Sequence, residues 1–350
     1  MARIRQSQRS KRKDEHLELA EKEQGVRRSS DFDFVHLVRP TLPETDVAQV
    51  DLHTSLFGKT LAAPLYINAM TGGSEKSASI NGALARIAAK LNIGMALGSA
   101  AILVAEPNLV DTFAIARKEN PQGLIFANIN PLVPPHEALK IIGALKADAL
   151  QIHVNALQEA VMPEGDRDFR WLARIKALKE ISPVPVIVKE VGFGFDPESF
   201  RMLRGAGIEY VDVAGAGGTN FVDIENARRK DFSLGYLATA GFSTVKSLIN
   251  AQGCGVGIFA SGGMRNALDM LKSLTYGSMA VGISGALLHI LVSSGEKAAL
   301  QFAADLIEQL RMLCALYGIA EPVAATQIKK YYDRELLNYI SQKKHSFSLD

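Results

Sequence analysis

A cluster of polar side chains follows a short apolar run near the middle of the chain: His153, Asn155, Gln158 and Glu159. The amides of Asn155 and Gln158 stay neutral and can only orient a ligand, whereas His153 and Glu159 can titrate or bind a metal. One carboxylate beside amides suits a Mg²⁺ ion that keeps mostly water and phosphate ligands. It does not suit Zn²⁺, which prefers several His or Cys ligands. His153 taken alone is better explained as a hydrogen-bonded histidine in a polar loop.

Lys189 ends the apolar run Val186-Ile187-Val188, where a lysine is costly to bury unless it points into a cavity. A cation in that position could stabilise an anionic ligand such as the pyrimidine ring of a reduced flavin. Two alternatives stay open. Lys189 could be a surface lysine at a strand end, or it could form a Schiff base with a carbonyl substrate.

Glycines gather in two segments late in the chain, Ser261-Gly262-Gly263 and Gly282-Ile283-Ser284-Gly285. Glycine lets the backbone approach phosphate oxygens closely, and a helix N-terminus adds N–H donors and a favourable dipole. We expect the first segment to open a helix at Met264 and the second to open the next helix. Together they predict a phosphate-binding cup, although each segment alone could simply be a tight turn.

Eight short apolar runs alternate with amphipathic segments, which indicates βα units and a parallel sheet. Eight such units in about 240 residues fit a closed (β/α)8 barrel, the TIM barrel, whose active site lies at the carboxyl ends of its strands. A doubly wound sheet would be expected to carry a GxGxxG loop after its first strand, and Met70-Thr71-Gly72-Gly73 lacks that spacing. The predicted strands are Ala63–Asn68, Gly94–Leu97, Leu124–Asn128, Leu150–Val154, Val186–Lys189, Tyr210–Val213, Gly257–Ala260 and Ser278–Val281. The predicted helices include Lys76–Leu91, Phe169–Ile181, Met264–Thr275 and Lys297–Tyr317.

We expect three parts along the chain: an N-terminal arm and barrel cover over residues 1–60, the barrel over 61–320, and a C-terminal helical tail over 321–350. The arm is basic and includes Arg12, Lys13 and His16, which suits either a solvated tail or an arm that folds over an anionic substrate. Apolar residues should anchor the cover to the bottom of the barrel: Phe32, Phe34, Val35, Leu37 and Leu52.

The composition excludes several classes of protein. The chain has 350 residues, 39 Lys and Arg against 37 Asp and Glu, and 47% apolar residues. Nearly balanced charge argues against a nucleic-acid partner. The absence of a long apolar run argues against a membrane span, and no apolar segment follows the basic N-terminus as in a secretory signal. The two cysteines, Cys254 and Cys314, lack metal-site spacing, and a cytoplasmic location is the default expectation.

Taken in order from Arg12 to Gly285, these segments resemble the type 2, FMN-dependent isopentenyl-diphosphate isomerases. The most specific match is His153-x-Asn155-x-x-Gln158-Glu159. Five further segments agree with the family: Arg12-Lys13-x-x-His16, Met70-Thr71-Gly72-Gly73, Val188-Lys189-Glu190, Gly217-Gly218-Thr219 and Ser261-Gly262-Gly263.

The resemblance implies a barrel that moves the double bond of a C5 diphosphate on reduced FMN, without net redox change. It also implies NADPH as reductant, Mg²⁺ for the diphosphate, and a homotetramer or homo-octamer. His153, Gln158 and Lys189 would be the catalytic residues, and Glu159 would bind the metal. The implied FMN contacts are Ala69, Met70, Thr71, Ser99, Asn128, Lys189, Thr219, Gly262, Gly263, Ala280 and Gly282. The implied substrate contacts are Arg12, Lys13, His16, His153, Asn155 and Gln158. We do not expect Gln158 to be a general acid, because an amide has no useful pKa near neutrality.

Three rivals remain. An FMN-dependent 2-hydroxy-acid oxidase would share the barrel but is expected to carry a late His-Gly-Gly-Arg, where this chain has Ser261-Gly262-Gly263-Met264-Arg265. A barrel similar to inosine-monophosphate dehydrogenase needs a loop cysteine after a strand. A binding protein that uses only its basic arm would bind no flavin.

Overall fold

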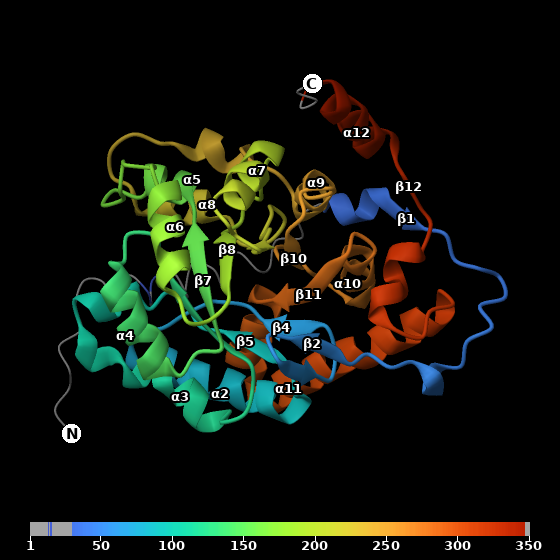
Figure 1. Cartoon of the computed structure of the whole chain (residues 1–350), viewed down its shortest axis with the longest axis horizontal. Helices are drawn as coiled ribbons and strands as arrows, with labels where there is room; N and C mark the ends of the chain where they lie inside the picture. The colour runs from blue at the N-terminus through green and yellow to red at the C-terminus, as the bar shows by residue number, and fades with distance from the viewer. Residues whose placement is uncertain (1–12, 14, 16–29, 347–350) are drawn as a thin grey trace.

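A computed structural model of the chain describes Lys13, Glu15 and residues 30–346. Its centre is a closed barrel of eight parallel strands, in the order β10-β11-β4-β5-β6-β7-β8-β9 around the ring (Figure 1). All eight predicted strands are present, so the expected barrel is confirmed. The strands are β4 (Leu65–Ile67), β5 (Gly94–Ala96), β6 (Ile125–Ile129), β7 (Ala149–Val154), β8 (Val186–Glu190), β9 (Tyr210–Asp212), β10 (Gly257–Ala260) and β11 (Ser278–Ile283).

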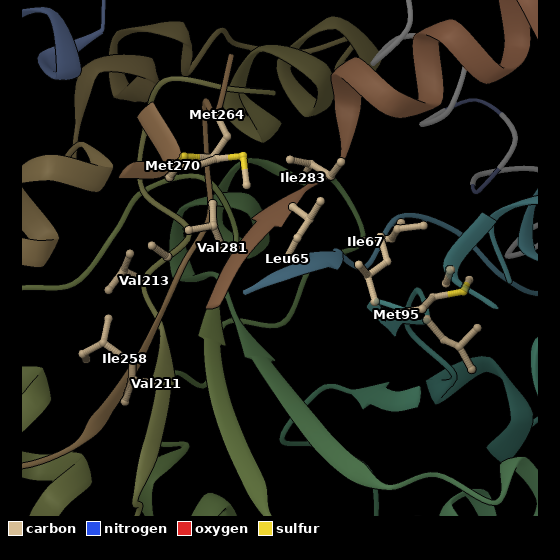
Figure 2. Close-up of a cluster of buried hydrophobic side chains, with 14 of the residues drawn as sticks. Leu65, Ile67, Met95, Val211, Val213, Ile258, Met264, Met270, Val281 and Ile283 are labelled. Carbon is tan, nitrogen blue, oxygen red and sulfur yellow. The ribbon is translucent and has the colours of Figure 1, made fainter. Parts of the chain in front are cut away.

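Side chains alternate along each strand between the barrel interior and the surrounding helices. Leu65 and Ile67 of β4 point outward into the core that the helices cover, and so does Val211 of β9 (Figure 2). Tyr66 belongs to the separate cluster inside the barrel. The same alternation puts Lys189 on the interior side of its strand, because Ile187, two residues earlier, belongs to that inner cluster.

Helices surround the barrel, and most follow a strand directly. They are α2 (Glu75–Leu91), α3 (Asp111–Glu119), α4 (Pro135–Leu145), α5 (Ala156–Val161), α6 (Leu172–Ile181), α7 (Pro197–Gly205), α8 (Phe221–Arg228), α9 (Thr244–Asn250), α10 (Ala267–Leu274), α11 (Gly285–Leu316) and α12 (Arg334–Ser346). No helix in the described part of the chain has the length and apolarity that crossing a membrane requires.

Two predicted helix starts, Phe169 and Met264, are each three residues too early. Helix α6 begins at Leu172. Helix α10 begins at Ala267 and not at Met264, because Asn266 caps it by accepting from the Asp269 amide at 3.0 Å. Gly262 and Gly263, with φ of 95° and 70°, form a left-handed turn that a helix cannot include. Helix α11 begins at Gly285, at the end of the second glycine segment as expected, and a break at Gly295 (φ 85°) divides it just before the predicted start at Lys297.

The hairpin of β2 (Thr54–Leu56) and β3 (Lys59–Leu61) covers the bottom of the barrel. The ring of Phe57, in its turn, lies 5.0 Å from Tyr210, 5.9 Å from Phe126 and 6.0 Å from Phe259. The expected anchors were therefore only partly right. Phe32, Val35 and Leu52 are buried, but in the core outside the strands, and Phe34 and Leu37 pack against that core.

The segments at the two ends of the described chain lie together (Figure 1). Strand β1 (Val35–Leu37) pairs antiparallel with β12 (Lys330–Tyr332) of the tail. The short helix η1 (Asp31–Phe34), just before β1, is tied to the loop after β10 by Asp33, whose carboxylate accepts from Arg265 at 2.7 Å. Residues from the N-terminal segment thus support one of the glycine loops that the sequence analysis selected.

Candidate active site

A cavity of about 1500 Å³ opens at the carboxyl ends of the barrel strands. Most of the residues that the sequence selected line this one cavity, although they come from all eight βα units. Those residues are Lys13, Ala69, Met70, Thr71, Ser99, Asn128, His153, Gln158, Glu159, Lys189, Thr219, Gly262, Gly263 and Gly282. The closed barrel brings them together because its parallel strands all end on the same side.

Lys189 reaches this cavity from β8 and is only 5% exposed, which excludes the surface-lysine explanation. Its Nζ donates to the backbone oxygen of Glu190 at 2.7 Å. Burial lowers the pKa of Lys189, and the carboxylate of Asp212, joined by Glu190 when that group is ionised, opposes the shift. A buried ammonium at the cavity wall would attract an anionic ligand strongly, because little water screens it.

Glu190, the next residue along, holds the turn after β8. Its Oε2 accepts from the amides of Phe193 at 2.5 Å and Gly194 at 3.2 Å. Burial raises the pKa of Glu190 to about 8, against the lowering effects of the Phe193 amide and of Lys189. At neutral pH this carboxyl is therefore mostly protonated.

His153 is held by a chain of side chains inside the barrel. Its Nδ1 lies 2.8 Å from Oδ1 of Asn128, and Nδ2 of Asn128 donates to Oε1 of Gln151 at 3.0 Å. Burial, with the charges of Lys189 and Lys13, lowers the pKa of His153 to about 4. His153 is therefore a neutral hydrogen-bonding group near pH 7, and it faces the cavity.

Asn155, which precedes helix α5, and Gln158, in its first turn, have different roles. Asn155 caps the helix: its Oδ1 accepts from the Gln158 amide at 2.8 Å and its Nδ2 donates to the Val191 oxygen at 2.8 Å. Gln158 faces the cavity, and its Nε2 donates to Oε1 of Glu225 at 2.9 Å. Glu225 lies on α8, which packs beside α5, and its side chain is fully buried.

Glu159 presents the carboxylate that the sequence selected for Mg²⁺. It lines the cavity, and its Oε2 accepts from the Asp166 amide at 2.8 Å. Among the described residues, no group of three or more His, Cys, Asp or Glu side chains could enclose a metal ion. One carboxylate at an open cavity fits a Mg²⁺ that takes its other ligands from water and a bound phosphate, and it does not fit a structural metal site.

The glycine loops after β9 and β10 pack against each other as well as lining the cavity. A Cβ on Gly262 would lie 2.2 Å from the Gly215 oxygen, and one on Gly263 would lie 2.6 Å from the Gly217 carbonyl carbon. Within the described residues, no hydrogen bond uses the amides of Gly262 or Gly263. The tight-turn interpretation is therefore confirmed, and the phosphate interpretation stays a prediction that these two amides are placed to serve.

The N-terminal arm is described only at Lys13 and Glu15. The Lys13 ammonium donates to the Ser99 backbone oxygen and lies 5.4 Å from the centre of the Phe113 ring. Glu15 forms an ion pair with Arg228 of α8, with 3.5 Å between Oε2 and Nε. Arg12 and His16 lie outside the described residues.

The structure does not bring two of the expected residues to the cavity. Ala280 lies in the apolar cluster inside the barrel, below the cavity. Asn155 uses its side chain to cap α5, as described above.

Conversely, the sequence analysis did not select Arg228, which lines the cavity, or Asp212 and Glu225, which accept hydrogen bonds from the cavity-lining residues Ser261 and Gln158. An acid at the end of the apolar run Tyr210-Val211-Asp212 resembles the pattern that selected Lys189 and could have been found, whereas Glu225 stands in an ordinary helical segment.

Comparison with known proteins gives the class first. The family model described as FMN-dependent dehydrogenase matches residues 16–108 and 109–329, so the chain belongs to this class of flavin-dependent barrels. Curated relatives then give the particular family. The isopentenyl-diphosphate delta-isomerase of Lacticaseibacillus casei (strain BL23) is 46% identical over 314 residues, which cover 90% of this chain and 91% of the relative. The enzyme of the same name from Latilactobacillus sakei subsp. sakei (strain 23K) is 42% identical over 98% of this chain and 99% of the relative. The chain belongs to the isopentenyl-diphosphate delta-isomerase family.

Solved structures support the fold. A mandelate oxidase with an FMN monooxide adduct has a TM-score of 0.61 at 16% identity, covering 91% of this chain and 92% of the oxidase. A mandelate oxidase with benzoyl-formic acid has a TM-score of 0.62 at 17% identity, covering 91% and 90%. At this identity the likeness concerns the fold alone. The oxidase rival is weaker, because a serine stands where its histidine is expected and Arg265 is held by Asp33 and Asp269. The rival similar to inosine-monophosphate dehydrogenase is weaker too, because neither Cys254 nor Cys314 lines the cavity.

Proposed function

We propose that this isomerase converts isopentenyl diphosphate into dimethylallyl diphosphate on reduced FMN, with no net redox change. The observation that carries the proposal is Gln158, a neutral amide that Glu225 orients at the wall of a cavity also lined by buried Lys189 and by unused glycine amides. An alkene is a very weak base, and an ordinary side-chain acid does not protonate it easily. A site built for this reaction needs orientation and exclusion of water more than a strong acid.

FMN would bind with its phosphate at the amides of Gly262 and Gly263 and its ring system near Lys189. Further contacts come from Ala69, Met70, Thr71, Ser99, Asn128, Thr219 and Gly282, which line the cavity. When bound and reduced, the flavin would supply a proton to one end of the double bond and stabilise nearby positive charge, and the substrate would lose one proton from the neighbouring carbon as the double bond moves. Lys189 favours the anionic reduced form by its charge, and NADPH is the proposed reductant.

The diphosphate would be held by Glu159 through Mg²⁺ and by Lys13 and neutral His153 directly. Arg12 and His16 join this set on sequence grounds alone. A planar guanidinium and a mobile ammonium neutralise different parts of a diphosphate, so both are useful at such a site. Gln158 would lie against the reacting carbons, where its amide orients them without adding a competing charge.

An anaerobic assay with isopentenyl diphosphate, FMN, NADPH and Mg²⁺, with the product identified by mass spectrometry and NMR, tests the proposal. We expect dimethylallyl diphosphate as product and NADPH consumed only to reduce the flavin. The matched control is an aerobic assay with mandelate and lactate that measures hydrogen peroxide. Turnover of those acids without isomerisation would favour the oxidase. Light scattering on the same preparation tests the proposed homotetramer or homo-octamer.

A further inference from the structure

Asp212 lies inside the barrel, directly below the cavity, and is the residue on which this inference rests. It ends β9 and has no exposed surface. Its Oδ2 accepts from the Tyr66 hydroxyl at 2.6 Å and from Nδ2 of Asn68 at 3.3 Å. Its Oδ1 accepts from the Ser261 hydroxyl at 2.6 Å and from the Ala214 amide at 3.3 Å. Four donors converge on one carboxyl group, and the anionic carboxylate is the form that they fit.

The neighbour of Asp212 across the ladder is Lys189. The two residues are register partners on the adjacent strands β8 and β9, and both side chains are on the interior side of the barrel. Among residues 30–346, the other titratable groups around Lys189 are Glu190 on its own strand, its register partner His153 on β7, and Tyr66 of β4 beyond Asp212. Lys13 acts on His153 from above the barrel.

These groups differ in the charge that they carry at neutral pH. Burial raises the pKa of Glu190 to about 8, and His153, with a pKa of about 4, is neutral. Burial and the negative charge of Asp212 raise the pKa of Tyr66 well above its ordinary value, so its hydroxyl stays a donor. Asp212, whose four donors fit a carboxylate, faces Lys189 across the ladder and opposes the loss of the Lys189 proton.

We propose that Asp212 is a positioning residue that acts on the flavin through Lys189: its buried carboxylate keeps the Lys189 ammonium charged and so sets the preference of the site for reduced over oxidised FMN. The inference deepens the proposed function and rests on the FMN site described there. Its physical basis is that a charge buried without a counter-charge is expensive, so removing the carboxylate favours a neutral lysine.

The first experiment needs no flavin. Competitive labelling of the apoprotein with acetic anhydride, followed by mass spectrometry of the Lys189 peptide across a pH series, measures the apparent pKa of Lys189. Asp212→Asn, which is nearly isosteric, should lower that pKa relative to wild type. The matched control is Tyr66→Phe, which removes one donor but keeps the carboxylate and should change the titration much less. Asp212→Ser is a second neutral variant in case the first does not fold.

The second experiment uses the holoenzyme. The two-electron midpoint potential of bound FMN, measured across pH, should fall in Asp212→Asn once Lys189 has lost its proton. We expect a roughly tenfold weaker preference for reduced FMN, which equals about 30 mV for a two-electron couple. Lys189→Met should show the same fall at every pH.

An unchanged Lys189 titration in both neutral variants overturns the inference. A midpoint potential that rises at every pH also overturns it, because Asp212 would then act on the flavin by its own charge. Failure of the protein to bind FMN would instead contradict the proposed function, since the apoprotein titration does not depend on the cofactor.

Discussion

Nε2 of Gln158 donates to Oε1 of Glu225 at 2.9 Å, so the amide that faces the cavity is oriented by a carboxylate on the neighbouring helix. Glu225 is held in turn by Arg228, whose Nη1 donates to Oε2 of Glu225 at 2.5 Å. Because a carboxylate only accepts, it requires the NH2 group of Gln158 on its side and turns the amide oxygen away from Glu225.

Glu225→Gln should therefore lower kcat while leaving FMN binding unchanged. The amide of a glutamine can both donate and accept, so it would pair with either orientation of the Gln158 amide and no longer fix one. A charge-assisted hydrogen bond contributes about 1.5–3 kcal/mol, or roughly one to two decades in rate if it acts in the transition state. The matched control is Glu164→Gln, since Oε1 of Glu164 pairs with the same Arg228, 2.9 Å from its Nη2. Equal losses in both variants would assign the effect to Arg228.

Glu159→Gln should raise the Mg²⁺ concentration needed for half-maximal activity and raise KM, with FMN still bound. Removing the charge weakens the attraction to the cation, whereas the Asp166 amide can still donate to the remaining side-chain oxygen. Activity measured over a Mg²⁺ titration checks this. Asp166→Asn, in the same loop, is the control. If Asp166→Asn shifts the Mg²⁺ dependence and Glu159→Gln does not, the ligand has been assigned to the wrong carboxylate.

Lys13→Gln should raise KM for isopentenyl diphosphate by about tenfold or more, because one charge-assisted phosphate contact is lost. FMN affinity should stay the same, since the glycine loops and Lys189 remain. Lys90→Gln, an exposed change at the end of α2, is the control. Removal of residues 1–13 extends the test to Arg12 and should lower kcat/KM further. A truncated enzyme with wild-type kcat/KM would show that the arm is a solvated tail.

Glu190 should make the stability of the protein fall as pH rises. Its pKa is raised from 4.5 to about 8 in the folded protein, so within that window the folded state keeps a proton that the unfolded state has lost. The contribution is fully present below the unfolded pKa and is lost as pH rises through the folded pKa. The slope for one proton is at most about 1.4 kcal/mol per pH unit.

Glu190→Gln should remove this slope, because a glutamine oxygen can still accept from the amides of Phe193 and Gly194 without titrating. Melting temperatures of the apoprotein between about pH 6 and about pH 8 measure the difference, and wild type should lose more than the variant. The exposed residue Glu198, changed to Gln, is the control. Parallel pH profiles for wild type and Glu190→Gln would show that the Glu190 carboxyl is ionised throughout this range.

The barrel could be predicted from the sequence because its strands are short apolar runs separated by turn residues and amphipathic segments. Each strand is covered on both faces, and a strand covered on both faces has to be apolar along its length. By the same rule, Lys189 is an exception, because it is a charged residue in a strand that is otherwise apolar. Helix starts were less predictable. Helix α10 begins at Ala267, directly after the Asn266 cap, and not at Met264, because the side-chain cap sets the start of the helix and not the end of the glycine loop.

The sequence by itself determined the types of chemical group and the order in which they follow the strands. The tertiary structure alone decided which of these groups share the cavity and what charge they carry. In the folded chain Asn155 caps a helix, and Ala280 lies below the cavity. Glu225, 67 residues from Gln158 in the sequence, forms a hydrogen bond with it. It also raised the pKa of Glu190 and lowered that of His153 through burial. Charge state and pairing depend on distance and on exposure to water, and neither is encoded in the spacing of residues along a chain.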